Sequence, residues 1–284
     1  MREDNHGCNI QAELQGVLND AMVAGDREKP RALVIVPTYN ERENIGEVAR
    51  RVFEAVAEDV DLMIIDDGSP DGTAETVKAL RRASSRTHLI ERPNKAGLGT
   101  AYITAFKWAL SREYWAVVEM DGDLSHNPGD VPRILDALRN ADLVIGSRYA
   151  HGGSVHNWSR FRRVLSRVGN AYAEMMLRLG VRDATSGFRA FRTEMLRRLD
   201  LDQVRSEGYA FQIELTWLVY SRGGVIREVP IAFTERASGS SKLSKRIVAE
   251  ALVWVSAWGI RRRTTQRNAG SATHDVPVPW SGDQ

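Results

Sequence analysis

Short apolar runs alternate with longer amphipathic segments in the first half of the chain, and this alternation most restricts the possible folds. The runs at 32–36, 62–65 and 143–146 are apolar and mostly aliphatic, which is typical of strands buried on both faces. Segments with helical periodicity lie between such runs, for example at 43–58. Strands and helices in alternation predict an α/β fold with a mostly parallel sheet flanked by helices.

Polar clusters follow three of the expected strands. They occupy positions 39–41, 66–71 and 121–123. Ligands of open parallel sheets bind beyond the carboxyl ends of the strands. We therefore expect the three clusters to converge on one edge of the sheet.

The cluster Asp121-Gly122-Asp123 ends a buried strand at 115–120 and places two carboxylates one residue apart. Carboxylate oxygens suit Mg²⁺ or Mn²⁺, and Mg²⁺ commonly takes one or two carboxylates together with water and substrate phosphates. The alternative is an ordinary turn with a solvated acidic tip, because Asp-Gly is common in turns. The other two acidic strand ends favour the metal site.

Charge is unevenly distributed, although the net charge is only +2. From Arg148 to Arg198 there are eleven arginines against three carboxylates. Arginine favours bidentate contact with phosphate. This basic middle predicts anionic small molecules, a membrane surface or nucleic acid as partners, and charge alone does not choose among them.

Composition excludes several classes of protein. The single cysteine, Cys8, permits no internal disulfide and no cysteine-based metal cluster. The first residues lack the apolar core of a signal peptide, and nowhere do about eighteen apolar residues follow one another, so we expect no transmembrane helix.

The last periodic segment has two interpretations. Its apolar positions recur at helical spacing, and it closes with three arginines at 261–263. It is either an interfacial helix, with tryptophans near lipid headgroups and arginines on anionic lipid, or a helix packed on the core. The apolar positions are Ile247, Ala251, Trp254, Val255 and Trp258.

Several motifs occur in the order typical of one enzyme family. They are PTYNERENI at 37–45, DDGSPDGT at 66–73, GLGTAY at 97–102, MDGDLSHNP at 120–128, GSRY at 146–149, SGFRAFR at 186–192, GYAFQIEL at 208–215, EVPIAFTER at 228–236 and GSSKL at 239–243. Together they resemble the inverting nucleotide-sugar glycosyltransferases of family 2 with the GT-A fold. The closer likeness is to dolichol- or polyprenol-phosphate mannose synthases.

The resemblance implies transfer of mannose from GDP-mannose to a polyprenyl phosphate, giving polyprenyl-phospho-mannose and GDP. It implies Mg²⁺ or Mn²⁺ as cofactor and a peripheral position on the cytoplasmic, inner face of the cell membrane, reached directly or through a separate integral membrane protein. The likeness covers about residues 31–260, so we expect an extension at 1–29, a catalytic GT-A domain at 30–240, an amphipathic helix at 241–263 and a disordered tail at 264–284.

On the donor side, the resemblance implies that Asp121 and Asp123 hold the metal on the donor diphosphate. Members of the family often have glutamine where this chain has Ser125, so either the shorter Ser125 or a water takes that ligand position. The residues implied to border the nucleotide, its base and its ribose are Pro37, Tyr39, Glu41, Asp66 and Asp67.

Two cationic groups complete the implied site. Arg236 and Lys242 would close over the donor, and Arg148, Arg162 and Ser166 would receive the acceptor phosphate. Asp123 would also be essential for catalysis as a metal ligand.

Three other functions are alternatives to mannosyl transfer from GDP-mannose. A related transferase could use UDP-glucose with the same lipid acceptor. A dinucleotide-dependent oxidoreductase is disfavoured, because the run from Gly97 puts Tyr102 where the GxGxxG motif needs a small residue. A non-catalytic binder of nucleic acid or membrane would leave three acidic strand ends without purpose, so we expect no nucleic-acid partner.

Overall fold

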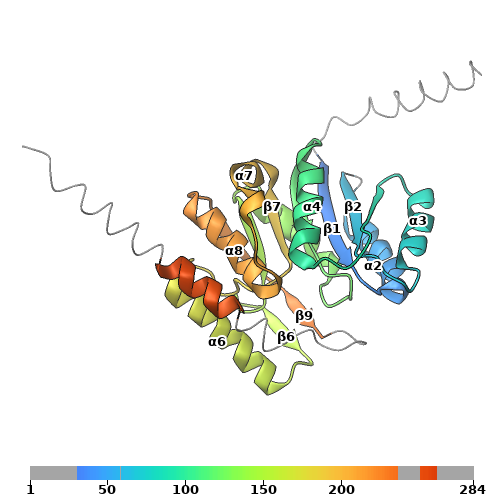
Figure 1. The fold of residues 1–284 in the computed structure, drawn as a ribbon. Helices are drawn as coiled ribbons and strands as arrows, with labels where there is room; N and C mark the ends of the chain where they lie inside the picture. The colour runs from blue at the N-terminus through green and yellow to red at the C-terminus, as the bar shows by residue number, and fades with distance from the viewer. Residues whose placement is uncertain (1–30, 58, 236–249, 261–284) are drawn as a thin grey trace, which may run out of the picture.

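The computed structural model describes residues 31–57, 59–235 and 250–260. Its centre is a seven-stranded sheet with helices against both faces (Figure 1). The strand order is β3 (Thr87–Glu91), β2 (Val60–Asp66), β1 (Arg31–Thr38), β4 (Tyr114–Glu119), β7 (Arg189–Arg192), β5 (Leu143–Ser147), β8 (Ile226–Pro230). All neighbours pair in parallel except that β7 runs antiparallel to both β4 and β5. The predicted mostly parallel α/β sheet is confirmed.

Side chains alternate between the two faces of the buried strands, as the pleat requires. In β1, Leu33 and Ile35 face one core, whereas Val34 and Val36 face the other. The first core is covered by α4 (Leu98–Leu110), α6 (Arg160–Leu177), α7 (Thr193–Arg198) and α8 (Gly208–Ser221). The second is covered by α2 (Arg42–Ala55), α3 (Thr73–Ala83) and α5 (Val131–Leu138). Both faces are therefore dry, which explains the continuous apolar runs.

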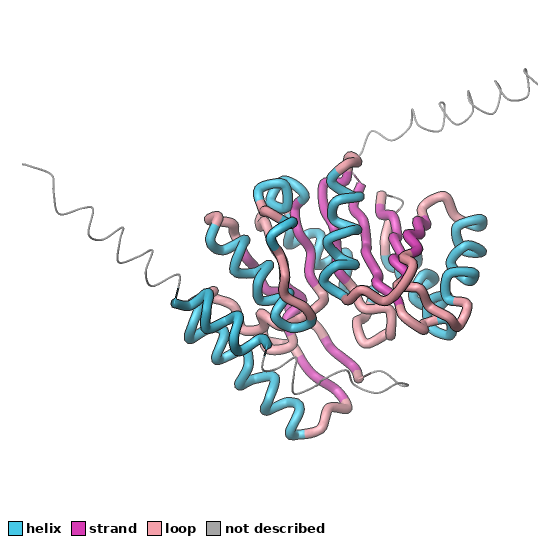
Figure 2. The backbone as a smooth tube through the Cα atoms, viewed as in Figure 1, coloured by secondary structure: helices cyan, strands magenta, loops and turns pink. Residues whose placement is uncertain are grey.

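A second, small layer lies beyond the carboxyl end of the sheet. Strands β6 (Ser154–His156) and β9 (Ala232–Thr234) pair in parallel, away from the main sheet (Figure 2). The long helix α6 runs beside them, and a helix at 250–260 lies along α6 (Figure 1). Tyr172 and Ser256 join these two helices through a 2.6 Å hydrogen bond between their hydroxyls.

The helix at 250–260 buries Val255 and Trp258 against the core and leaves Val253 and Ile260 exposed. Part of the expected amphipathic segment is thus packed on the protein and part of it faces outward. None of the helices in the described ranges has the length and apolar character needed to cross a membrane.

Among the α-helices and β-strands of the described ranges, β6, β7 and α7 were not predicted from the sequence. In β7 the segment Arg189–Arg192 has an arginine at each end, so no apolar run marks it as a central strand. Arg189 is nevertheless fully buried, and it lies opposite Glu119 of β4 in the strand register. The hydrogen bonds of its guanidinium, which a strand pattern does not reveal, make this strand possible.

The Arg189 guanidinium is satisfied almost entirely by backbone oxygens. It donates to the carbonyls of Ser186, Ala184 and Gln212, with distances of 2.9 Å from Nε to Ser186 O and from Nη1 to Gln212 O. Glu119 Oε2 lies 3.9 Å from Arg189 Nε and accepts a 2.9 Å hydrogen bond from Gln212 Nε2. Burial raises the pKa of the Glu119 carboxyl to about 8, although Arg189 opposes the shift. This network ties β4, β7 and α8 together directly below residue 121.

The raised pKa of Glu119 predicts a pH-dependent stability. The folded state binds this proton up to about pH 8, whereas the unfolded chain releases it near pH 4.5, so stability falls as pH rises between these values. The slope contributed is roughly 1.4 kcal/mol per pH unit at most. Urea unfolding from pH 5 to 8 should show that Glu119→Gln flattens this decline. The exposed control Glu43→Gln should keep the wild-type slope, and an unchanged slope in Glu119→Gln would contradict the assignment.

Candidate active site

The polar ends of β1, β2 and β4 meet at one edge of the sheet, as predicted. Thr38 lies opposite Asp66 in the register of β1 and β2, and its hydroxyl donates a 2.9 Å hydrogen bond to Asp66 Oδ1. On the other side of β1, a Cβ built on Gly122 would lie only 3.1 Å from Val36 Cγ1. Glycine at position 122 therefore lets the turn after β4 approach the end of β1 closely.

The turn at 121–125 is held by its own backbone and by His126. Leu124 has a φ of 61°, a left-handed conformation that is rare for a branched residue and often occurs at functional sites. Asp123 Oδ1 accepts a 3.1 Å hydrogen bond from the Ser125 amide. The buried His126 accepts a 3.2 Å hydrogen bond from the Asp121 amide through Nδ1. Burial lowers the pKa of this imidazole, so it serves as a neutral support for the turn.

The chemistry of this turn fits a hard divalent cation. Within the described ranges, no three His, Cys, Asp or Glu side chains come together so that they could hold a metal ion. The turn offers Asp121 and Asp123, both partly exposed, and Mg²⁺ commonly uses only one or two protein carboxylates. Ser125 Oγ is buried beside them and has no hydrogen-bond partner among the described residues. These oxygen donors suit Mg²⁺ or Mn²⁺ and leave room for substrate oxygens and water.

The end of β1 presents the three residues that were predicted to border the nucleotide. Pro37 and Tyr39 are partly exposed, and Lys95 Nζ lies 3.9 Å from the centroid of the Tyr39 ring. Glu41 Oε2 accepts a 2.8 Å hydrogen bond from Asn44. Asn40, between Tyr39 and Glu41, has a φ of 61°. The strand end is thus a bent, partly open loop.

Asp66 and Asp67 are more buried than a surface contact would require. Asp66 accepts hydrogen bonds from the Thr38 hydroxyl and from the amide and hydroxyl of Ser69, at 2.6 to 2.9 Å. Asp67 Oδ1 lies 2.8 Å from Arg92 Nε. Both carboxylates thus shape the loop after β2, and their predicted contact with base and ribose stays a prediction.

Arg148 forms a buried, two-point ion pair at the end of β5. Its Nε and Nη2 donate to the two oxygens of Asp183 at 2.8 and 2.7 Å, and Nη2 also donates to Thr185 Oγ1. The Arg148 amide adds a third bond to Asp183. One edge of the guanidinium is therefore committed to the protein. The prediction that Arg148 receives a phosphate stays a prediction, with Asp183 as a partner that sequence reasoning missed.

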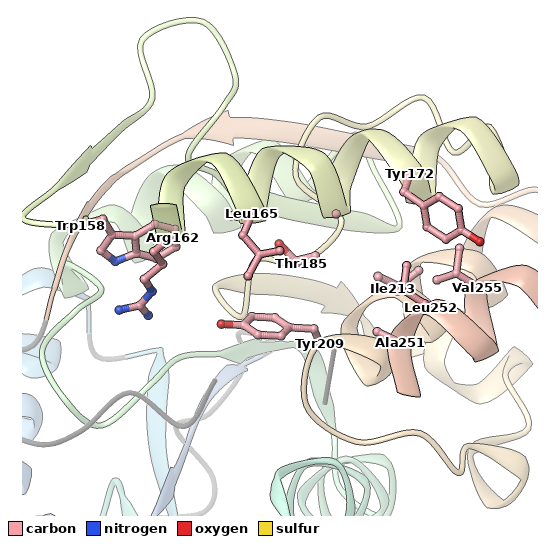
Figure 3. Close-up of a pocket in the computed structure, with 12 residues that line it drawn as sticks. Trp158, Arg162, Leu165, Tyr172, Thr185, Tyr209, Ile213, Ala251, Leu252 and Val255 are labelled. Atoms are coloured by element: carbon pink, nitrogen blue, oxygen red, sulfur yellow. The ribbon is translucent and has the colours of Figure 1, made fainter. Parts of the chain in front are cut away.

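An apolar pocket with a cationic end lies between α6, α8 and the helix at 250–260. Figure 3 shows Arg162 and Trp158 at one end and Tyr172 and Val255 at the other. The Tyr209 hydroxyl points toward the Arg162 end. The pocket has a volume of about 90 Å³ and is also lined by Leu165, Ser166, Gly169, Thr185, Ile213, Ala251 and Leu252. It thus brings together two of the residues predicted to bind a phosphate, Arg162 and Ser166.

A continuous chain of ring contacts connects the acidic turn to this pocket. The His126 ring lies 5.2 Å from that of Phe233, and Phe233 lies 5.4 Å from Trp158. Arg162 Cζ then stacks 4.2 Å from the centroid of a Trp158 ring. Two aromatic side chains, Phe233 and Trp158, therefore lie between the acidic turn and Arg162. Trp158 and Phe233 were not singled out from the sequence, because only the tertiary structure brings them together.

The remaining predicted donor residues, Arg236 and Lys242, lie outside the described residues. The glycine motif at 97–99 opens α4, but the Gly99 amide there donates to Glu207 Oε2 at 3.1 Å. A Cβ on Gly97 would lie 2.8 Å from the same carboxylate. This helix N-terminus is thus occupied by a carboxylate of the chain itself, which further disfavours the dinucleotide interpretation.

Comparison with known proteins agrees with this geometry. A family model for glycosyl transferase family 2 matches residues 33–200. The chain is 48% identical over 239 residues to a polyprenol monophosphomannose synthase of Mycolicibacterium smegmatis, covering 84% of this chain and 90% of that relative. It is 46% identical to an undecaprenyl-phosphate mannosyltransferase of Micrococcus luteus, covering 82% and 96%.

Solved structures share the fold at lower identity. Glucosyl-3-phosphoglycerate synthase from Mycobacterium tuberculosis, crystallised with Mn²⁺, UDP-glucose and phosphoglyceric acid, superposes with a TM-score of 0.60 at 22% identity, covering 81% of each chain. The mixed sheet with its acidic strand ends is therefore a GT-A fold. Together with the family match over more than half of its length, this shows that the chain is a glycosyltransferase of family 2.

Proposed function

We propose that this enzyme transfers mannose from GDP-mannose to a polyprenyl phosphate with inversion at the anomeric carbon. The observation that carries the proposal is the apolar pocket that Arg162 and Ser166 help to line, which Phe233 and Trp158 connect to the acidic turn. An isoprenoid phosphate has this same combination of an apolar chain and an anionic head. The names of the two relatives, a polyprenol monophosphomannose synthase and an undecaprenyl-phosphate mannosyltransferase, support the same acceptor class and sugar.

The acceptor's own charge explains why no dedicated base is needed. The second pKa of a phosphate monoester is about 6, so at neutral pH it is mostly a dianion and already a nucleophile. In our proposal its oxygen attacks C1 of mannose as the bond to GDP breaks, and a single displacement inverts the anomeric centre. The protein's task is to hold two anions close together and in line.

Cationic groups on each side make that approach possible. Arg162 would neutralise the acceptor phosphate, with the hydroxyls of Ser166 and Tyr209 beside it. Asp121 and Asp123 would hold Mg²⁺ or Mn²⁺, with Ser125 or a water as a further ligand. When bound, such a metal acts as a Lewis acid that offsets charge on the leaving diphosphate. The bound Mn²⁺ named for glucosyl-3-phosphoglycerate synthase supports a divalent metal here.

The remaining donor contacts are proposed in the same way. Pro37, Tyr39 and Glu41 would border the nucleotide, and Asp66 and Asp67 would shape the loop that meets its base and ribose. UDP-glucose with the same acceptor is the alternative donor. Incubation of the protein and Mg²⁺ with radiolabelled GDP-mannose or UDP-glucose and polyprenyl phosphate, followed by analysis of the lipid product, decides between them.

An exposed apolar stripe on α6 supports a membrane surface as partner. Phe161, Val164, Val168 and Met175 are 58–75% exposed and recur at helical spacing along one side of the helix. The exposed Arg160, Arg163 and Arg167 follow the neighbouring side. Such a face fits the headgroup region of an anionic membrane.

The helix at 250–260 extends this apolar surface. Leu252 is 43% exposed and also lines the pocket, so the acceptor pocket adjoins the proposed membrane face. We propose that the protein binds peripherally to the cytoplasmic, inner face of the cell membrane, by itself or with a separate integral membrane protein. In this scheme 30–240 is the catalytic domain, 241–263 is the membrane-facing helical segment, and 1–29 and 264–284 are an extension and a tail.

Removal of a metal ligand should abolish turnover without unfolding the protein. We expect Asp123→Ala to lower kcat by roughly 100-fold or more, because charge on the leaving diphosphate loses its counter-ion. Radiolabelled mannose transfer at saturating Mg²⁺ or Mn²⁺ measures this, and circular dichroism checks the fold. The exposed control Asp136→Ala should retain wild-type rates. Wild-type turnover in Asp123→Ala would refute the metal assignment.

Truncation of Arg162 should act on the acceptor. We expect Arg162→Ala to raise the acceptor KM by roughly tenfold or more, as the loss of a charge-assisted hydrogen bond predicts, with little change in the donor KM. Steady-state kinetics with each substrate varied in turn separates the two effects. Arg81→Ala, on the exposed side of α3, is the control. An unchanged acceptor KM would remove Arg162 from the proposed phosphate site.

A charge placed in the apolar stripe should weaken membrane binding. We expect Phe161→Glu combined with Val168→Glu to lower co-sedimentation with anionic vesicles by roughly tenfold. The double variant loses two apolar contacts with the membrane and adds two negative charges that anionic lipid repels. Val225→Glu changes an equally exposed valine elsewhere and should bind vesicles like the wild type. Equal sedimentation of all three proteins would contradict the proposed face.

A further inference from the structure

Arg162, at the cationic end of the pocket, already has an anionic partner from the protein itself. Its Nη1 lies 2.5 Å from Glu235 Oε1, and the two side chains are 18% and 34% exposed. Glu235 is not among the residues predicted from the sequence. The pair lies at the point where the proposed function needs a positive charge for the acceptor phosphate.

The contact with Glu235 uses only one of the hydrogen-bond donors of the Arg162 guanidinium. Among the described residues, Glu235 contacts Arg162 through Nη1 alone, and the buried Arg162 Nε has no hydrogen-bond partner. The plane of the guanidinium is supported by Trp158, at 4.2 Å. Arginine binds carboxylate or phosphate best through two parallel hydrogen bonds. A ligand with several oxygens can therefore make a better contact with Arg162 than Glu235 makes.

The backbone of Glu235 is fixed by hydrogen bonds, whereas its side chain is partly exposed. The Glu235 amide donates to His156 O at 3.3 Å, and the preceding amide, of Thr234, donates to Ser125 O at 3.2 Å. These bonds tie the end of β9 to β6 and to the acidic turn. Because the Glu235 carboxylate is already partly in solvent, rotation of the side chain alone would release Arg162.

A phosphate and Glu235 cannot share Arg162 without cost. Two anions on one guanidinium would lie within a few ångströms of each other, in a pocket whose apolar walls screen charge poorly. The newcomer must therefore outcompete Glu235 for the same cation. Exchange of one singly charged anion for another gains little Coulomb energy, whereas a doubly charged anion gains from its second charge.

We propose that Glu235 is the resident counter-anion of the acceptor site, displaced by doubly charged phosphate monoesters and retained against singly charged lipid headgroups. This inference rests on the proposed function, since it assumes that Arg162 receives the acceptor phosphate. It assigns to Glu235 the exclusion of phosphodiester lipids, which carry one charge and would crowd a pocket opening beside a membrane. A polyprenyl phosphate, mostly a dianion at neutral pH, is admitted.

Competition between two short isoprenyl ligands tests the proposal. Farnesyl phosphate serves as the acceptor in mannosyl transfer from GDP-mannose, and methyl farnesyl phosphate, a phosphodiester with one charge, serves as a competitor. For Glu235→Gln we expect the inhibition constant of the diester to fall by about tenfold, and by more than the KM of farnesyl phosphate falls. Glu235→Ala, which also removes the charge, should behave alike and covers the case in which one variant does not fold.

Two results would overturn the inference. One is an unchanged ratio of the diester inhibition constant to the farnesyl phosphate KM. The other is a higher farnesyl phosphate KM in both variants, which would mean that Glu235 orients Arg162 and does not compete for it. Glu54→Gln is the matched control, since Glu54 pairs with Arg50 on exposed α2 and should leave the ratio unchanged. Failure of the wild type to mannosylate any isoprenyl phosphate would instead refute the proposed function.

Discussion

The buried pair of Arg189 and Glu119 is the interaction on which the rest of the site depends. The two residues face each other across β7 and β4, and both are fully buried. A guanidinium in such a place is tolerable only because carbonyls of Ser186, Ala184 and Gln212 also accept its hydrogen bonds. The antiparallel strand is thereby fixed inside a parallel sheet, and the turn that begins two residues after Glu119 has a rigid base.

In the proposed reaction, the protein has to hold two anionic substrates close to each other. The acidic turn lies on one side, where a metal could neutralise a diphosphate, and Arg162 lies on the other. Phe233 and Trp158 stand between them in ring contact, while the hydrogen bond from Thr234 to Ser125 fixes β9 against the turn. The ion pair with Glu235 shows that the charge of Arg162 is neutralised even without a ligand. An anionic acceptor would thus replace Glu235 as the partner of Arg162.

Much of the fold and part of the site could be predicted from the sequence. The apolar runs gave β1, β2 and β5, and the carboxyl-end rule correctly brought the clusters near Thr38, Asp66 and Asp121 to one edge. The strand at Arg189–Arg192 could not be recognised, because its first residue is an arginine whose burial depends on carbonyl acceptors that only the tertiary structure supplies. Asp183 could likewise not be recognised as the partner of Arg148, because the two residues are far apart in the chain.

The sequence by itself determined the α/β class, the acidic strand ends and the family, because these depend on local periodicity and on motifs in a fixed order. Only the tertiary structure decided which charges remain available to a ligand. Arg148 and Arg162 look equivalent in the sequence, yet Arg148 is held by two oxygens of the buried Asp183, and Arg162 by one oxygen of the half-buried Glu235. The availability of a charge depends on its partners and on the solvent around them, and both are set by contacts between residues far apart in the chain.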